Sequence, residues 1–163
     1  HNIFLYIWSY QLTKTMKERT IEYILRTTWL TVQKMYNEEA VKFESTMATG
    51  FTLLSIDPDK GTPSTALGPK MGMEATSLSR ILKTMETKGL IGRNPNPEDG
   101  RGVIINLTEF GREKRAYTRE RVLTFNETIK MNVSSEKLKH FYEVADLISD
   151  MISNKKVYNQ NDK

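Results

Sequence analysis

The chain has 163 residues, of which 38% are hydrophobic and 27% charged, and its formal net charge is +4. This length and apolar content fit one domain with a core of its own, and the positive charge is compatible with an anionic partner. The absence of cysteine excludes disulfide frameworks, thiolate zinc sites and cysteine-based redox switches. It also fits a reducing, cytoplasmic setting.

The first fifteen residues differ from the rest, because an apolar run extends from Ile3 to Tyr10. The run is too short to span a bilayer, and it lacks the flanking residues of a signal peptide. A well-patterned helix follows Met16. Two interpretations of residues 1–15 stay open: an artificial or start-site extension, and a genuine extension that packs in a dimer.

A 3.6-residue apolar period predicts the first helix over 18–39. A second, shorter helix is predicted from Met47 to Ile56, where a turn rich in Asp, Pro and Gly follows over 57–61. Both helices have an apolar side that needs a partner.

A third helix is expected to begin at Thr62-Pro63, because a hydroxyl can cap a helix whose first residue is proline. The same helix is expected to be short, because Gly68 and Pro69 interrupt it. Proline inside a helix removes a backbone hydrogen bond and crowds the preceding turn.

The fourth helix is predicted over 74–88, with Gly89 as its C-cap. A β-hairpin follows, with strands over 90–94 and 103–107 and a long loop between them. The fourth helix has a narrow apolar stripe, formed by Leu78, Ile81, Leu82 and Met85.

Thr108 is expected to cap a long helix, and Ser134 a last helix that runs through Ile152. A polar tail over 155–163 ends the chain as given.

The fourth helix carries the first candidate chemistry. If its apolar stripe faces the core, short hydroxyls and cations occupy the opposite side. Such residues can contact base edges and phosphates in a major groove, where Arg pairs with guanine. A solvated helix face would carry the same pattern. The candidates are Thr76, Ser77, Arg80, Lys83, Thr84 and Thr87.

The hairpin loop carries the second candidate. Asp99-Gly100-Arg101 places a guanidinium near the tip of the loop, with a carboxylate two residues before it. A rigidly presented Arg suits a narrow minor groove, whose negative potential attracts guanidinium. Taken alone, the pattern is common in surface loops.

In combination, these segments resemble the MarR (multiple antibiotic resistance regulator) family of winged-helix repressors. The order and spacing of the motifs match over 62–111, and the flanking helices fit over roughly 16–154. The residues that carry the resemblance are Ser79, Arg80, Lys88, Gly89, Leu90, Ile91, Arg93, Asp99, Arg101, Leu107, Thr108 and Gly111.

The resemblance implies a homodimer in which helices over 16–61 and 108–154 interlock, leaving 62–107 as the winged helix-turn-helix. It implies binding to a pseudo-palindromic operator, with the fourth helix in the major groove and Arg101, braced by Asp99, in the minor groove. It further implies an aromatic or amphipathic anion as effector, between the dimerisation helices and the winged helix.

Two features depart from the family pattern. Gly68-Pro69 stands where relatives have a continuous helix, which leaves Lys70 only a weak candidate for a phosphate contact. Gly100 stands where a bulkier, often basic residue is common, so a more flexible and less basic wing is expected.

The remaining candidate residues can also be explained without a functional role. Trp29, Met47 and Phe51 are possible lining residues of an effector pocket, and core packing explains them equally well. His140 with Glu143 makes no metal site by itself. A solvated helix face is favoured for the basic group after the wing, which consists of Arg112, Lys114, Arg115, Arg119 and Arg121.

The sequence therefore predicts a mainly α (α+β) fold, a winged helix-turn-helix with flanking dimerisation helices. The predicted function is that of a sequence-specific DNA-binding transcriptional regulator, a repressor that responds to a ligand. The alternative is a winged-helix module that binds protein. An enzyme is not expected, because the sequence has no cysteine, no Ser/His/Asp order with plausible spacing, no glycine-rich phosphate loop and no paired histidines. No cofactor or metal is expected either.

Overall fold

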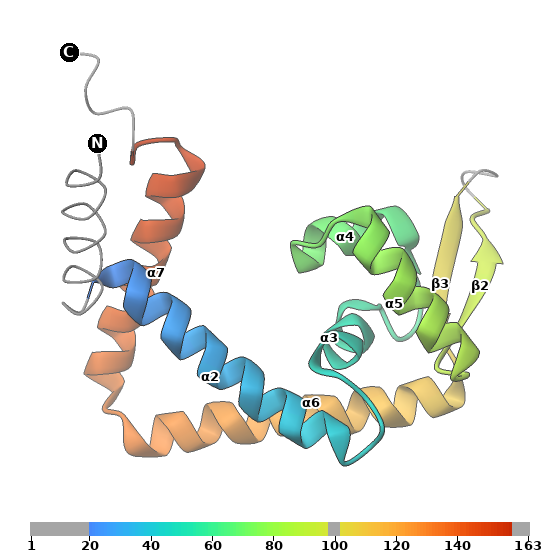
Figure 1. Ribbon diagram of the computed structural model, residues 1–163, viewed down its shortest axis with the longest axis horizontal. Helices are drawn as coiled ribbons and strands as arrows, with labels where there is room; N and C mark the ends of the chain where they lie inside the picture. Colours follow the sequence, from blue (N-terminus) through green and yellow to red (C-terminus); the bar gives the residue numbers. More distant parts are fainter. Residues whose placement is uncertain (1–19, 98–101, 158–163) are drawn as a thin grey trace, which may run out of the picture. The chain divides into compact units, whose positions relative to one another are not determined.

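A computed structural model describes residues 20–97 and 102–157 of the chain (Figure 1). The chain divides into two compact units, one ending at Arg115 and the other beginning at Ala116. The boundary falls inside a single long helix. The elements are, in order, α2 (Ile21–Val41), α3 (Met47–Ser55), β1 (Thr62–Pro63), α4 (Ser64–Met71), α5 (Ala75–Thr87), β2 (Ile91–Pro95), β3 (Val103–Leu107), α6 (Glu109–Asn132) and α7 (Ser135–Ser153).

The first unit is organised around an apolar core to which α3, α4, α5 and the sheet all contribute. Every one of the core residues is at most 7% exposed. Burial of apolar surface of this kind is the main favourable contribution to folding. The core consists of Leu53, Ile56, Leu67, Leu78, Leu82, Met85, Leu90, Ile91, Ile105 and Leu107.

The sheet has three antiparallel strands in the order β1-β3-β2. In the hairpin, Ile91 pairs with Leu107 and Arg93 pairs with Ile105. The hairpin was predicted correctly, one residue away from the observed start of β2. The short strand β1 was not predicted.

The expected cap at Thr62 is wrong. Thr62 and Pro63 form β1, and the Thr62 hydroxyl accepts a hydrogen bond from the Asp57 backbone N–H at 2.9 Å. The helix α4 begins one residue later, with Pro63 at its N-cap and no side-chain capping bond. Proline is tolerated in β1 because this strand lies at the edge of the sheet, where one side needs no N–H donor.

The expected interruption at Gly68-Pro69 is also wrong. The helix α4 is short, as expected, but it continues through both residues to Met71. Leu67 is fully buried, and the chain leaves the helix through Gly72 in the left-handed conformation, at φ +60°. We attribute the continuity to this anchor and to the C-cap, where Met73 N–H donates to Gly68 O at 3.0 Å.

The first helix, predicted over 18–39, is observed as α2 over Ile21–Val41, with Thr20 as its N-cap. The predicted caps at Thr108 and Ser134 are confirmed. Thr108 accepts a hydrogen bond from Gly111 N–H at 2.9 Å, and Ser134 accepts one from Lys137 N–H at 3.4 Å. The first of these distances is that of a good capping bond, and the second is longer. Part of the predicted tail, over 158–163, lies outside the described residues. All of residues 1–15 lie outside them as well.

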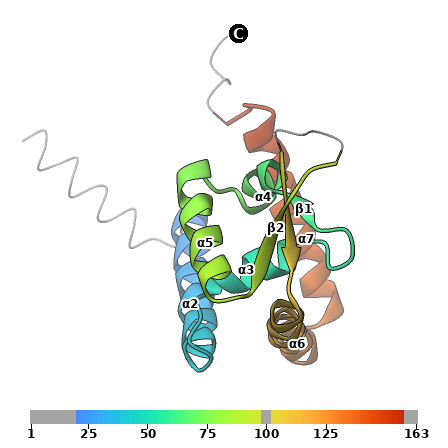
Figure 2. The ribbon, with the colours of Figure 1, turned by 90° about the vertical axis from the view of Figure 1, so that its right-hand side faces the viewer.

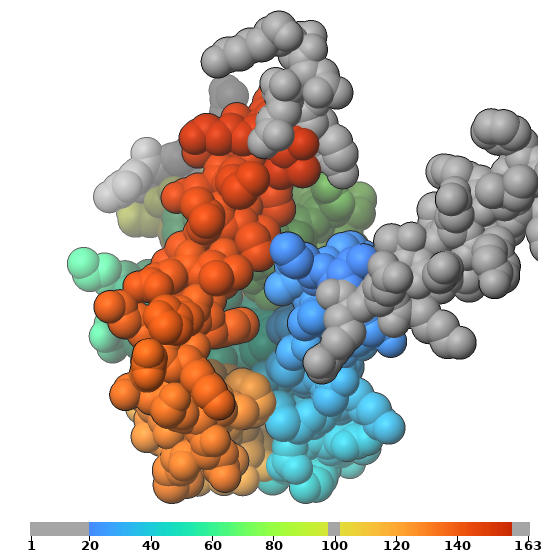
Figure 3. All heavy atoms as spheres, turned by 90° about the vertical axis from the view of Figure 1, so that its left-hand side faces the viewer, coloured from blue at the N-terminus to red at the C-terminus, as the bar shows by residue number. Residues whose placement is uncertain are grey.

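The helices α2 and α7 differ from the core elements, because neither contains a buried residue. Both carry large apolar side chains that are more than 40% exposed. The side chains of α7 reach the surface along its length (Figure 3, orange to red). These exposed residues are Ile21, Ile24, Leu25, Trp29 and Leu30 on α2, and Phe141, Tyr142, Val144, Leu147 and Ile152 on α7.

Candidate nucleic-acid interface

The helix α5 is held by the stripe that the sequence predicted. Leu78, Leu82 and Met85 are at most 4% exposed, and Ile81 packs against them at the edge of the core. Gly89 ends the helix at φ +68°, and its neighbour Leu90 donates its N–H to Met85 O at 2.9 Å. This is the bonding pattern of a Schellman cap. Three buried side chains and a glycine cap therefore determine which side of α5 faces outward.

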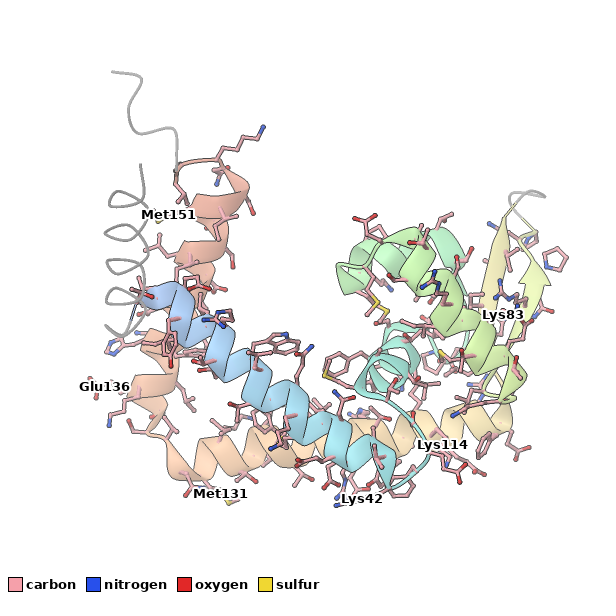
Figure 4. All side chains as sticks on the ribbon, viewed as in Figure 1. Lys42, Lys83, Lys114, Met131, Glu136 and Met151 are labelled. Atoms are coloured by element: carbon pink, nitrogen blue, oxygen red, sulfur yellow. The ribbon has the colours of Figure 1, made fainter. Side chains whose placement is uncertain are left out.

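The outward side of α5 carries the residues expected there. Thr76, Ser77, Arg80, Lys83, Thr84 and Thr87 are all exposed. Lys83 is labelled on α5 in Figure 4. The Thr84 hydroxyl donates to Arg80 O at 3.0 Å, so only its lone pairs and methyl group are left for a ligand. Neither Arg80 nor Lys83 has a carboxylate partner within 20–97 and 102–157.

The helices α4 and α5 form a helix-turn-helix, joined by Gly72, Met73 and Glu74. Gly68 fits against this turn, because a Cβ at that position would lie 3.1 Å from Met73 O. Lys70 is exposed on α4. The turn is thus fixed by a small residue and by backbone bonds.

The hairpin lies beside α5 (Figure 2), and the two are joined at Leu90 and Ile91, both of which are buried. The predicted wing residues Asp99 and Arg101 lie outside the described residues. Their expected contact with a minor groove stays a prediction.

One polar contact between α5 and the hairpin was missed in the sequence. Arg93 Nε on β2 donates to Glu86 Oε2 on α5 at 2.9 Å. The two residues are seven positions apart and belong to different elements that are separated by a turn. No helical or strand period therefore brings them together. The only signal was their opposite charge.

The candidate effector residues lie on two neighbouring helices. Trp29 is 48% exposed on α2, whereas Met47 and Phe51 are half-buried on α3. Phe51 meets Tyr36 of α2 edge to face, with ring centroids 5.7 Å apart. Burial raises the pKa of the Tyr36 hydroxyl. This part of α2 and α3 is therefore an aromatic contact between helices.

Several members of the basic group after the wing have partners in the fold. Arg112 donates to Pro58 O, and the Lys114 ammonium lies 5.3 Å from the Phe43 ring centroid and 5.0 Å from that of Phe110. Lys114 and Lys42 are labelled in Figure 4. Arg121 pairs with Glu120 at 2.8 Å. These contacts give the group structural roles in addition to solvation.

Two other kinds of functional feature do not occur among the described residues. His140 and Glu143 are both exposed, and no group of three metal-ligating side chains occurs among 20–97 and 102–157. Within the same residues, no helix is both long enough and apolar enough to cross a membrane.

A helix-turn-helix followed by an antiparallel hairpin on one core defines a winged helix-turn-helix protein. The model of the MarR family matches residues 46–103, which include α3, the helix-turn-helix and β2. Over this segment, which is about a third of the chain, the sequence is similar to the MarR family.

Individual bacterial proteins are also similar to part of the chain. The uncharacterized HTH-type transcriptional regulator YdgJ of Bacillus subtilis is 30% identical over 88 residues, which are 54% of this chain and 54% of YdgJ. The match thus spans about half the length of that relative.

Two crystal structures show the same fold. The MepR–DNA complex of S. aureus superimposes with a TM-score of 0.73 at 20% identity, covering 82% of this chain and 99% of MepR. PcaV of Streptomyces coelicolor, in complex with its natural ligand, has a TM-score of 0.69 at 16% identity, covering 81% of this chain and 93% of PcaV.

Proposed function

We propose that the chain is a sequence-specific DNA-binding transcriptional regulator, which binds a pseudo-palindromic operator as a homodimer. The observation that carries the proposal is the orientation of α5. Its apolar stripe is buried, while two cations stand on the outward side among short hydroxyls. These cations, Arg80 and Lys83, have no carboxylate partner in the described part of the chain. An α-helix presented in this way fits a major groove.

The residues assigned to the major groove are Thr76, Ser77, Arg80, Lys83 and Thr84. Arg80 is the proposed base reader, because its planar fork matches the O6 and N7 acceptors of guanine. Asp99 and Arg101 complete the proposal as the minor-groove contact. The MepR structure, which contains DNA, is consistent with this use of the fold.

The homodimer is proposed from the apolar surfaces of α2 and α7. Neither helix buries a residue, although each carries large apolar side chains. Monomeric soluble proteins rarely expose large contiguous apolar patches. A second copy of the chain would cover these surfaces and would place two α5 helices on one DNA duplex.

A small-molecule effector is proposed as the regulator of DNA binding. Trp29, Met47 and Phe51 are the lining candidates, since they bring aromatic and thioether groups to α2 and α3. An aromatic or amphipathic anion would fit such a lining. Its binding would release DNA by favouring a different spacing of the two α5 helices.

Selection of bound sequences from random duplex DNA tests the proposal. We expect a pseudo-palindromic consensus for the parent chain, and loss of base preference at one position per half-site for Arg80→Ala, at a cost of about 1 to 3 kcal/mol. Lys34→Ala is the matched control, because Lys34 is 79% exposed and belongs to α2, which is not assigned to the DNA contact.

An identical consensus for the parent and for Arg80→Ala would exclude Arg80 as a base reader. Absence of any salt-sensitive DNA binding by the parent would instead favour a module that binds protein, because neutralisation of phosphates makes DNA affinity fall steeply with salt.

A further inference from the structure

The contact between α5 and the hairpin has a geometry that suits a further role. Arg93 lies in the middle of β2 and has Ile105 as its partner across the sheet. Side chains alternate along a strand, so Arg93 is on the same sheet face as Ile91. Ile91 and Ile105 are buried against the core, whereas Arg93 extends past the edge of the core towards the last turn of α5.

The ion pair uses only one side of the guanidinium. Arg93 Nε donates to Glu86 Oε2, and no bond from either terminal nitrogen is found among residues 20–97 and 102–157. A guanidinium has five N–H donors, so four are left. The Arg93 side chain is 36% exposed, which leaves these donors accessible. The carboxylate thus fixes the direction of the guanidinium without using its terminal fork.

The ion pair between Arg93 and Glu86 contributes little to the stability of the fold. The Glu86 side chain is 44% exposed, and an ion pair this exposed contributes only about 0 to 1 kcal/mol. Glu86 also places a negative charge at the end of the helix proposed to meet DNA, where it would repel phosphate. Pairing with Arg93 offsets that charge and leaves an oriented donor in its place.

We infer that Glu86 is a positioning residue, which aims the terminal nitrogens of Arg93 at one phosphate of each operator half-site. A planar fork held in one direction binds phosphate through two parallel hydrogen bonds. This inference rests on the proposed function and adds to it a pair that joins the recognition helix to the hairpin. Arg93 contributes register, because phosphate contacts position a protein on the duplex without reading sequence.

The experiment measures the affinity of the selected operator over a range of KCl concentrations by fluorescence anisotropy. We expect Arg93→Ala to weaken specific and random DNA alike, and to lower the slope of log affinity against log salt by about two per dimer, one phosphate from each half-site. Lys34→Ala, which also removes one exposed positive charge, should leave the slope nearly unchanged.

The variants of Glu86 separate positioning from simple repulsion. Glu86→Ala should weaken the operator about tenfold, the size of one charge-assisted hydrogen bond, and adding Arg93→Ala to it should cost little more. Glu86→Gln should restore most of the affinity, because an amide oxygen can still accept from Arg93 Nε. Thermal unfolding of each variant would verify that the fold is retained.

Two results would overturn the inference while leaving the proposed function intact. One is tighter operator binding by both Glu86→Ala and Glu86→Gln, which is the signature of a repelling charge. The other is an unchanged salt slope for Arg93→Ala. If the parent chain selected no DNA at all, the proposed function and this inference would fail together.

Discussion

The central and terminal regions of the chain bury their apolar side chains to different extents. Between β1 and β3, most leucines and isoleucines of α4, α5 and the hairpin are almost fully buried within one chain. In α2 and α7, side chains of the same kind stay in contact with solvent, with Ile21 65% and Leu147 60% exposed. Apolar burial contributes about 25 cal/mol per Å². The core of the winged helix is thus filled by side chains of one chain, whereas the apolar side chains of the terminal helices would be covered only in the proposed dimer.

The largest expected effect comes from placing charge on α7. Phe141 and Val144 lie one turn apart and are 60% and 54% exposed. Lysine is a good helix former, so Phe141→Lys with Val144→Lys would be tolerated on a solvated helix. Buried in a dimer, unpaired charges are costly. We expect the dimer to weaken by at least about 100-fold, or about 2.7 kcal/mol, measured by sedimentation velocity.

The matched control is Asp146→Lys, which changes an exposed residue of the same helix that is already charged. It should leave the dimer nearly intact and should bind operator like the parent. A double lysine variant that sediments as the parent does would show that this surface of α7 is not the one covered in a dimer.

A medium effect is expected at Gly111, in the first turn of α6. A Cβ at this position would lie 1.9 Å from Leu90 O, which is backbone and cannot turn aside. Overpacking of this kind typically costs about 1 to 3 kcal/mol. Gly111→Ala should therefore lower the midpoint of urea unfolding at fixed protein concentration.

Gly92→Ala provides the comparison, because a Cβ there meets nothing within 4 Å. Its midpoint should be equal to or above that of the parent. Equal midpoints for the two alanine variants would contradict the close packing of α6 on the end of α5.

The smallest effect is expected at Asp57, in the turn before β1. Hydrogen bonds from the backbone N–H groups of Lys60 and Asp59 lower the pKa of the Asp57 carboxyl. Because the folded-state pKa is depressed, the stabilisation is present above the unfolded-state pKa and is lost as pH falls through the folded-state value. Asp57→Asn should unfold at a slightly lower temperature near pH 7.

The pH dependence gives this prediction its test. The difference in unfolding temperature between the parent and Asp57→Asn should shrink as pH falls below about 4, the region in which aspartate is protonated. A difference that stays constant from pH 7 to pH 3 would mean that the charge of Asp57 has no part in the turn.

Local patterns in the sequence were enough for the long helices and for the orientation of α5. The stripe from Leu78 to Met85 follows the helical period, so its burial needed no knowledge of the partner elements. The caps at Gly89 and Thr108 were equally local. For the same reason, the outward position of Arg80 could be predicted before any fold was known.

Contacts between different elements could not be predicted from local sequence patterns. Thr62 and Pro63 match a helix start, but pairing with Ile104 and Ile105 some forty residues later makes them a strand. Pro69 ordinarily breaks a helix, but buried Leu67 anchors the turn around it. The pairing of Glu86 with Arg93 depends on how the hairpin packs on α5, which no single period encodes.

The most direct test of the central claim is hydroxyl-radical footprinting of the chain on its selected DNA. A homodimer with one α5 in each of two major grooves should protect two segments about one helical turn, or 10 to 10.5 base pairs, apart. One protected segment, or protection that does not depend on the DNA sequence, would contradict a dimeric, sequence-specific regulator.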